Sequence, residues 1–162
     1  MAFDAKEYRS ALGSFATGVT VVTTTDHNGI GHGLTFNSFT SVSLDPPLVL
    51  WCLGNKSDSY ELFAKTEHYV INVLGAGTKD SAMRFAGKGD QRLADDEYQT
   101  LKTGAPSLNQ AIAIFDCTVV RRVEAGDHLI LIGETQAFLS RAGGGLTYFR
   151  GSFGDTERLI AG

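Results

Sequence analysis

The sequence contains little proline, little cysteine and no excess of positive charge. Only three of its 162 residues are proline and two are cysteine. Cys52 and Cys117 are far apart along the chain, so neither a CxxC redox pair nor a local set of thiolate metal ligands can form. Each cysteine lies within an apolar, strand-like run, and we expect two buried free thiols.

The charge balance and the lack of long apolar runs exclude two classes of partner. With 14 Lys and Arg against 18 Asp and Glu, the net charge of −4 provides no basic surface for a nucleic-acid backbone. Apolar runs such as residues 47–53 are far shorter than the about 20 residues of a membrane helix. The first ten residues also lack the charge pattern of a signal peptide. We therefore expect a cytoplasmic protein that binds neither nucleic acid nor membrane.

Several catalytic and nucleotide-binding motifs are absent as well. Every G-x-G pair lacks the third glycine of the dinucleotide fingerprint, and there is no Walker loop. No GxSxG elbow is present, so a serine hydrolase has no support from the sequence. The four histidines have no HExxH spacing and no paired cysteines beside them, and we expect no metal site.

Glycine, in contrast, is abundant, with 19 residues in a chain of about the length of one domain. We predict a single domain over residues 1–162 with many tight turns. Asp4 can cap a first helix that ends at Gly18 and carries Tyr8, Leu12 and Phe15 on one face.

Most of the remaining chain has the pattern of β-strands. An Asn-Gly turn connects residues 19–25 to a long strand that continues to residue 43. Residues 48–53 are predicted to form a fully buried central strand because they lack polar alternation. Further strands are predicted over residues 69–74, 111–126, 128–140 and 146–153, with helices over 57–65 and 78–87. The pattern indicates one antiparallel sheet that closes, or nearly closes, into a barrel with peripheral helices. Residues 87–110 lack periodicity and are predicted to be a surface excursion that covers a site.

Neutral polar side chains are dense between Leu34 and Ser43. Hydroxyl and amide groups are tolerated on an exposed strand face, but they also suit hydrogen bonding to a planar heteroaromatic ring. Residues 55–59 offer a lysine and hydroxyls at a helix start, which fits either a phosphate site or a simple helix cap. The glycines at 143–145 fit a hairpin turn better than a phosphate loop.

Several motifs together resemble the short-chain flavin reductase family, the reductase components of two-component flavin-dependent monooxygenases. They are FATGVTVVTT at 15–24, GLTFNSFTSVSLDPPLVLWCL at 33–53, VINVL at 70–74, Arg84-Phe85, Gly126-Asp127-His128 and Tyr148-Phe149-Arg150-Gly151. The resemblance covers nearly the whole chain.

This resemblance implies a homodimeric antiparallel split β-barrel of the Greek-key, FMN-binding type. It implies an enzyme that reduces FMN or FAD by hydride transfer from C4 of NADH or NADPH to flavin N5 and supplies reduced flavin to a partner monooxygenase. A non-catalytic flavin-binding split-barrel protein is the alternative. The implied flavin-binding residues are Thr35, Asn37, Ser38, Ser41, Lys56, Ser57, Ser59, Arg84 and Phe85. His128 is implied as the catalytic residue that seats the nicotinamide, together with the nicotinamide-binding residues Tyr148, Gly151 and Phe153.

Overall fold

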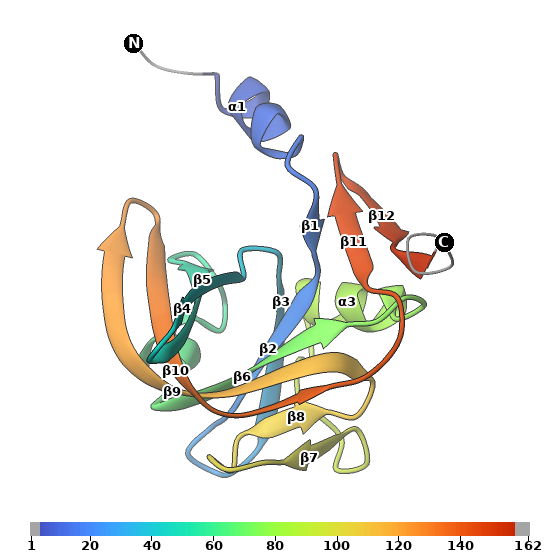
Figure 1. Cartoon of the computed structure of the whole chain (residues 1–162). Helices are drawn as coiled ribbons and strands as arrows, with labels where there is room; N and C mark the ends of the chain where they lie inside the picture. Colours follow the sequence, from blue (N-terminus) through green and yellow to red (C-terminus); the bar gives the residue numbers. More distant parts are fainter. Residues whose placement is uncertain (1–3, 158–162) are drawn as a thin grey trace.

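The computed structural model describes residues 4–157, and its architecture is dominated by one curled, seven-stranded antiparallel sheet (Figure 1). Its strands, in spatial order, are β3 (Gly31–Phe36), β2 (Thr20–Thr25), β6 (His68–Leu74), β9 (Ala111–Ala125), β10 (His128–Ser140), β5 (Pro47–Gly54) and β4 (Thr40–Leu44). The edge strands β3 and β4 do not pair with each other, so the barrel stays open. The predicted mainly antiparallel β fold of the split-barrel type is confirmed.

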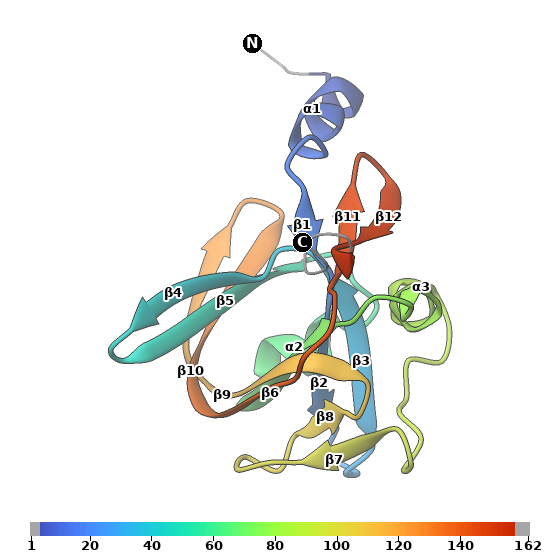
Figure 2. The ribbon, with the colours of Figure 1, turned by 45° about the vertical axis from the view of Figure 1, so that its right-hand side comes forward.

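Smaller elements surround this sheet (Figure 2). A three-stranded sheet has the order β1 (Thr17–Gly18), β11 (Leu146–Phe149) and β12 (Ser152–Asp155), and β7 (Tyr98–Thr100) pairs with β8 (Pro106–Leu108). The helices are α1 (Ala5–Leu12), α2 (Tyr60–Lys65) and α3 (Lys79–Ala86). In the described part of the chain, no helix has the length and apolar character needed to cross a membrane.

The core consists of two hydrophobic clusters. One is centred on the aromatic side chains of Trp51, Phe63 and Tyr69, whose rings meet edge to face at centroid distances of 5.7 and 5.8 Å from Trp51. The other includes Phe85 on α3 and Leu108 on β8. Edge-to-face packing stabilises aromatic pairs beyond the area that they bury. The two clusters attach both α2 and α3 to the sheet.

The strand over residues 47–54 differs from the predicted central strand. β5 lies between β10 and the edge strand β4, and its side chains alternate between buried and partly exposed. The predicted long strand up to residue 43 is also interrupted, at residues 37–39. There the Oγ of Ser38 accepts a hydrogen bond from the backbone N–H of Cys52, at 3.0 Å. A side chain therefore takes the place of a strand carbonyl, and the chain bends between β3 and β4.

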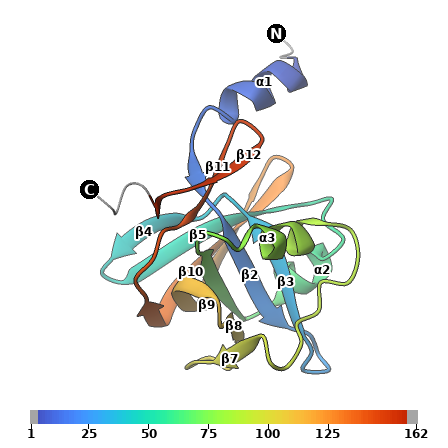
Figure 3. The same ribbon diagram turned by 90° about the vertical axis from the view of Figure 1, so that its right-hand side faces the viewer.

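The N-terminal helix is correctly predicted at its start and wrongly at its end. Asp4 caps it by accepting hydrogen bonds from the backbone of Lys6 and Glu7, at 2.9 and 2.8 Å. The helix stops at Leu12 rather than at Gly18, because the chain turns at Gly13 toward β1. As Figure 3 shows, α1 stands away from the sheet. Tyr8, Leu12 and Phe15, which the sequence placed on one face of this helix, are all exposed, and Phe15 lies beyond its end.

Residues 87–110 are more ordered than an excursion over a site. The backbone N–H of Gly33 donates to the carbonyl of Gln91 at 2.9 Å, and that of Leu93 donates to Gly31 at 2.8 Å. This segment therefore pairs with the outer edge of β3. Further along, the backbone N–H of Leu108 donates to the buried Oδ1 of Asn72, at 2.7 Å, which fixes β8 to the sheet.

The two thiols differ in their environment. Cys117 is buried, as predicted, and burial raises its pKa to about 12. Cys52 is only partly buried, because it lies on the face of β5 opposite to the buried Trp51 and Leu53, and desolvation raises its pKa as well.

Candidate functional site

A cavity of about 420 Å³ lies between α3 and the β11–β12 hairpin. It is lined by Val19, Thr35, Phe36, Asn37, Met83, Ala86, Tyr148, Gly151 and Phe153. The fold thus brings together residues that are more than a hundred positions apart in the sequence, namely the end of β3 and the last hairpin. Thr35 and Asn37, which were predicted to bind flavin, line this cavity. Tyr148, Gly151 and Phe153, which were predicted to bind nicotinamide, line it as well, but His128 does not.

The walls of the cavity are held by specific contacts. The Oγ1 of Thr35 donates to the carbonyl of Ala82 on α3, at 2.7 Å, and keeps its lone pairs free to accept. The rings of Tyr148 and Phe153 meet edge to face with centroids 5.2 Å apart, and the ammonium of Lys79 lies 5.7 Å from the Phe153 centroid. These contacts fix the position of both walls.

The cavity suits a flat, neutral heteroaromatic ring system. None of its lining side chains is charged, and apolar and aromatic groups form most of its surface. Thr35 and Asn37 supply neutral hydrogen-bonding groups at its edge. Apolar walls with a few convergent polar groups are typical of sites for small molecules and cofactors. A flavin or nicotinamide ring therefore fits the residues that are present.

Asn37 is the residue at which three hollows meet. Besides the ring cavity, it lines a hollow of about 540 Å³ with Ser38 and Phe39 and another of about 920 Å³ beside α1. Ser38 is partly occupied by its hydrogen bond from Cys52. Ser41, in contrast, lies exposed on the edge strand β4, opposite Val49, and lines none of these three hollows.

The predicted phosphate-binding residues form a separate group before α2. The Oγ of Ser57 accepts from the backbone of Ser59 at 3.3 Å, and the Oγ of Ser59 donates to Oε1 of Gln91 at 2.7 Å. Lys56 lies in the same loop, and its side chain is exposed. Ser59 and Gln91 line a hollow of about 280 Å³. The sequence also allowed a simple helix cap, by Ser57. The helix begins later, at Tyr60 with Ser59 in the cap position, and Ser59 makes no side-chain cap hydrogen bond.

His128 lies beside this loop rather than in the ring cavity. Its Nδ1 is 2.7 Å from Oδ1 of Asp127, whose pKa is lowered by this hydrogen bond and further by the charges of His128 and Lys56. The backbone N–H of Asn55 donates to the carbonyl of Asp127 at 3.0 Å. Figure 1 shows the β9–β10 turn and the β11–β12 hairpin on different sides of the molecule. A single chain therefore does not bring His128 together with Tyr148.

Arg84 and Phe85 are both engaged within the protein. The side chain of Phe85 is 1% exposed and packs beneath Gly33. The guanidinium of Arg84 lies 4.7 Å from the Phe85 ring centroid, forms an ion pair with Glu97 and donates to the carbonyl of Arg92 at 2.7 Å. Both side chains thus connect α3 to its surroundings, and Phe85 can offer a ligand only its backbone.

Other parts of the site could not be found from the sequence. Val19, Met83 and Ala86 form cavity walls, but apolar residues of this kind occur throughout the core.

The glycines at 143–145 form a closely packed connection. The carbonyl of Gly144 accepts a hydrogen bond from the backbone N–H of Ala76 at 2.7 Å, and a Cβ on Gly144 would meet residue 157. The flanking strands β10 and β11 lie in different sheets, so residues 143–145 connect two sheets and the predicted hairpin turn is wrong. Over residues 4–157, no group of three or more His, Cys, Asp or Glu could hold a metal ion.

Comparison with known proteins defines the class. Residues 12–157 match the model of the flavin reductase like domain, and the chain belongs to this family. The match covers all the described strands. This confirms the family that the sequence motifs indicated.

Individual relatives extend this assignment. The chain is 40% identical to "FMN reductase (NADH) SmoA" of Agrobacterium fabrum, over 96% of this chain and 88% of that protein. It is 44% identical to "Flavin-dependent trigonelline monooxygenase, reductase component" of Acinetobacter baylyi, over 91% of this chain but 48% of that protein. With 49% and 66% coverage of two Rhizobium meliloti relatives, the chain spans about half to two thirds of several curated relatives. The solved structure of the NADH:FAD oxidoreductase SgcE6 of Streptomyces globisporus, with NAD and FAD fragments, aligns with a TM-score of 0.84 at 35% identity, over 95% of each chain.

Proposed function

We propose that this protein is an NAD(P)H:flavin oxidoreductase that reduces FMN or FAD and supplies the reduced flavin to a flavin-dependent monooxygenase. The observation that carries this proposal is the cavity in which Thr35 and Asn37 face Tyr148 and Phe153 across neutral walls. The names of two relatives, an NADH-dependent FMN reductase and a monooxygenase reductase component, support the same conclusion.

The protein's part in this reaction is positioning. When two stacked rings are bound, the cofactors themselves supply the chemistry, a direct hydride transfer that needs no catalytic triad. Thr35 and Asn37 would hydrogen-bond to the polar edge of the flavin ring, while Tyr148 and Phe153 form the opposite aromatic wall. Thr35 is tied to α3, and Lys79 of α3 lies over the Phe153 ring, so the two sides of the cavity are set relative to each other. Such fixed geometry lowers the barrier by placing the reacting atoms in contact.

The remaining predicted residues would act outside the ring cavity. We propose that Lys56 and Ser57 bind the flavin phosphate, with Ser59 holding the loop through Gln91. Ser38 and Ser41 would contact the ribityl chain, from the bend after β3 and from β4.

The direct experiment mixes the purified protein with FMN or FAD and follows the loss of NADH or NADPH absorbance under air. We expect rapid oxidation that depends on added flavin, and the pair with the highest rate identifies both preferences. A bound yellow flavin without turnover would instead support the alternative, a non-catalytic flavin-binding protein. Absence of both flavin binding and turnover would contradict the proposal.

His128 provides a first prediction on the nicotinamide side. From its position beside Lys56 we propose that it contacts the nucleotide outside the ring cavity. Replacing it with alanine should raise the KM for the nicotinamide about fivefold, as expected for loss of one hydrogen bond of about 1 kcal/mol, with little change in flavin affinity. His27→Ala, which removes an exposed imidazole in the turn before β3, is the control. Equal rates of the alanine variant at subsaturating nicotinamide would refute this role.

We also propose that the protein is a homodimer. Several large apolar side chains are exposed, including Leu44 on the edge strand β4 at 96% and Phe138 on the interior strand β10 at 70%. The end of β9, residues 120–125, is exposed on both faces, so it lacks a cover within one chain. Apolar patches of this kind mark protein interfaces, and stable dimers bury large surfaces.

The dimer can be tested with Phe138→Asp. A charge at a desolvated interface should weaken self-association by about tenfold or more, measured by sedimentation equilibrium. Thr100→Asp, on the exposed strand β7, adds the same charge at another surface and should leave the dimer intact. A monomeric wild-type protein would refute the dimer, and an unchanged dimer in the Phe138 variant would place the interface elsewhere.

A further inference from the structure

A second hollow, of about 920 Å³, lies between α1 and the tip of the β11–β12 hairpin. It shares Asn37, Tyr148 and Gly151 with the ring cavity, so the two spaces adjoin. A ligand whose ring occupies the cavity could therefore extend into this hollow without leaving the protein surface.

The hollow is basic, in a chain with a net charge of −4. Lys6, Arg9 and Arg150 line it, against one carboxylate, Glu7. Among the described residues, none of these three basic side chains forms an ion pair. Their charges come from opposite ends of the sequence and meet only in the folded chain. Positive charge without internal partners, gathered in a concave surface, favours anionic ligands.

Arg150 is fixed in position by a tight turn and by hydrogen bonds. It is the one non-glycine residue of the described chain with a positive φ, 46°. Its backbone N–H donates to the carbonyl of Gly13 at 2.9 Å, and its Nε and Nη2 donate to Oγ of Ser14 at 3.3 and 3.2 Å. Arg150 and Gly151, whose φ is 82°, are the two central residues of the tight turn between β11 and β12, and such turns favour positive φ. A guanidinium has five N–H donors, so others stay free after the bonds to Ser14.

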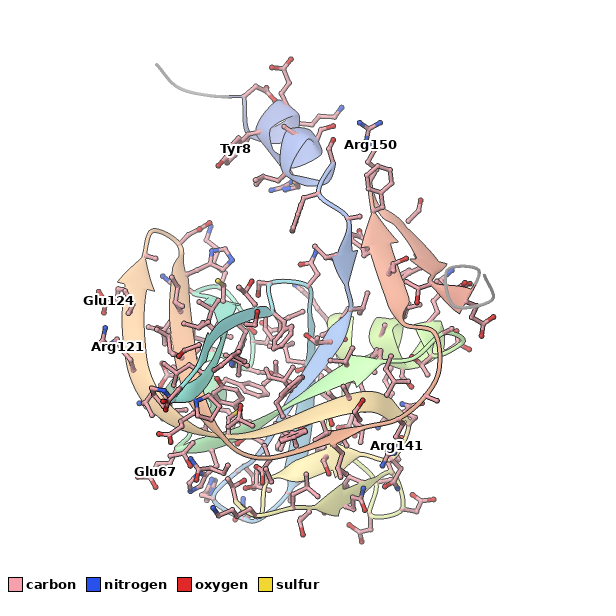
Figure 4. The ribbon with its side chains drawn as sticks, viewed as in Figure 1. Tyr8, Glu67, Arg121, Glu124, Arg141 and Arg150 are labelled. Atoms are coloured by element: carbon pink, nitrogen blue, oxygen red, sulfur yellow. The ribbon has the colours of Figure 1, made fainter. Side chains whose placement is uncertain are left out.

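Figure 4 places Arg150 at the tip of the hairpin, with Tyr8 on the other side of α1. The planar guanidinium lies over the Phe149 ring, 5.3 Å from its centroid. Arginine fixed in this way recognises phosphate oxygens through parallel N–H donors.

We propose that Lys6, Arg9 and Arg150 bind the phosphate groups of a dinucleotide whose ring lies in the adjoining cavity. This inference rests on the proposed function and deepens it, since it assigns the basic residues that distinguish one nucleotide from another. The dinucleotide is the nicotinamide co-substrate, which carries a diphosphate beyond the ring, because the phosphate of the flavin is assigned to Lys56 and Ser57. A 2′-phosphate adds charge that this hollow can neutralise, so NADPH gains more from it than NADH.

The test measures equilibrium dissociation constants for NADH, NADPH, FMN and FAD by fluorescence titration at two salt concentrations. Arg150→Gln should weaken binding of the dinucleotide about tenfold, the loss expected for a charge-assisted hydrogen bond. Arg150→Gly should do the same, and it relieves the positive φ, so a folding defect is not the cause. Lys6→Gln and Arg9→Gln should each have a smaller effect. Lys102→Gln removes the same charge from the exposed β7–β8 connection and should change nothing.

The pattern of losses identifies the ligand. Weaker binding of NADPH and NADH with unchanged flavins supports the inference, whereas weaker FAD with unchanged FMN would assign the hollow to the adenylate end of FAD and overturn it. Unchanged constants for all four ligands, or equal losses for FMN and FAD, would overturn the inference. If the wild-type protein binds no flavin and oxidises no nicotinamide, the proposed function itself fails, which is a different result.

Discussion

Replacing Gly133 with alanine is expected to lower the free energy of unfolding by about 3 kcal/mol, which corresponds to a fall in melting temperature of about 9 °C. Gly133 lies on β10, and a Cβ there would be 2.3 Å from Oη and 2.7 Å from Cζ of Tyr69. It would also be 2.9 Å from the Cβ of Cys117. Both neighbours are fully buried, so neither can move aside easily.

A second substitution separates this clash from other effects. Tyr69→Phe removes the nearest atom, and the Oη of Tyr69 has no hydrogen-bond partner among the described residues. The double variant should therefore recover part of the lost stability, and Tyr69→Phe alone should cost under about 1 kcal/mol. Gly18→Ala is the matched control, since its Cβ would meet nothing within 4 Å. Equal stability of the Gly18 and Gly133 variants would contradict the prediction.

Replacing Gly33 with alanine should affect both stability and flavin binding. The added Cβ would lie 2.8 and 2.9 Å from two ring carbons of Phe85, and 3.1 Å from Val21. Phe85 must then shift, and with it α3, whose Met83 and Ala86 line the ring cavity. We expect a loss of about 2 kcal/mol in stability from overpacking, and a flavin affinity lower by about tenfold.

Thermal unfolding and flavin titration measure these two effects separately. In the double variant Gly33→Ala, Phe85→Leu, the smaller side chain should relieve the clash, so the two changes should cost less together than their sum. Gly18→Ala again serves as the control for stability. Normal flavin affinity in a destabilised Gly33 variant would show that α3 does not set the cavity wall.

The local elements were predictable where sequence pattern and environment agree. The strands over 111–125 and 128–140 combine β-branched alternation with the turn at Gly126, and they occur almost as predicted. The start of the first helix was predicted from Asp4, whose side chain makes the expected cap. In each case the signal is local and does not depend on the rest of the chain.

The errors arise where distant contacts decide. The bend at Ser38 depends on Cys52, and the pairing of residues 91–93 with β3 depends on an open sheet edge. Neither partner is visible in a local pattern. The exposed face of α1 has the same apolar spacing as a buried one, and spacing alone does not reveal what covers it.

The residues of the candidate site also divide into those that the sequence could predict and those that it could not. The motifs identified Thr35, Asn37, Tyr148 and Phe153, and the fold brings these four together. His128 and Lys56 form a separate group, which no spacing rule could have shown. The basic hollow could not be predicted from the sequence, because Lys6 and Arg150 lie near opposite ends of the chain.

The two edge strands of the large sheet differ in how far other segments cover them. Residues 91–93 cover the β3 edge with backbone hydrogen bonds, whereas β4 pairs only with β5 and is exposed along most of its length. An uncovered edge strand is a template for pairing with strands of other molecules, and so a risk for aggregation. If the second copy packs over this side, loss of the dimer and loss of solubility should occur together. Subunit assembly would then act as the molecule's protection against strand-to-strand precipitation.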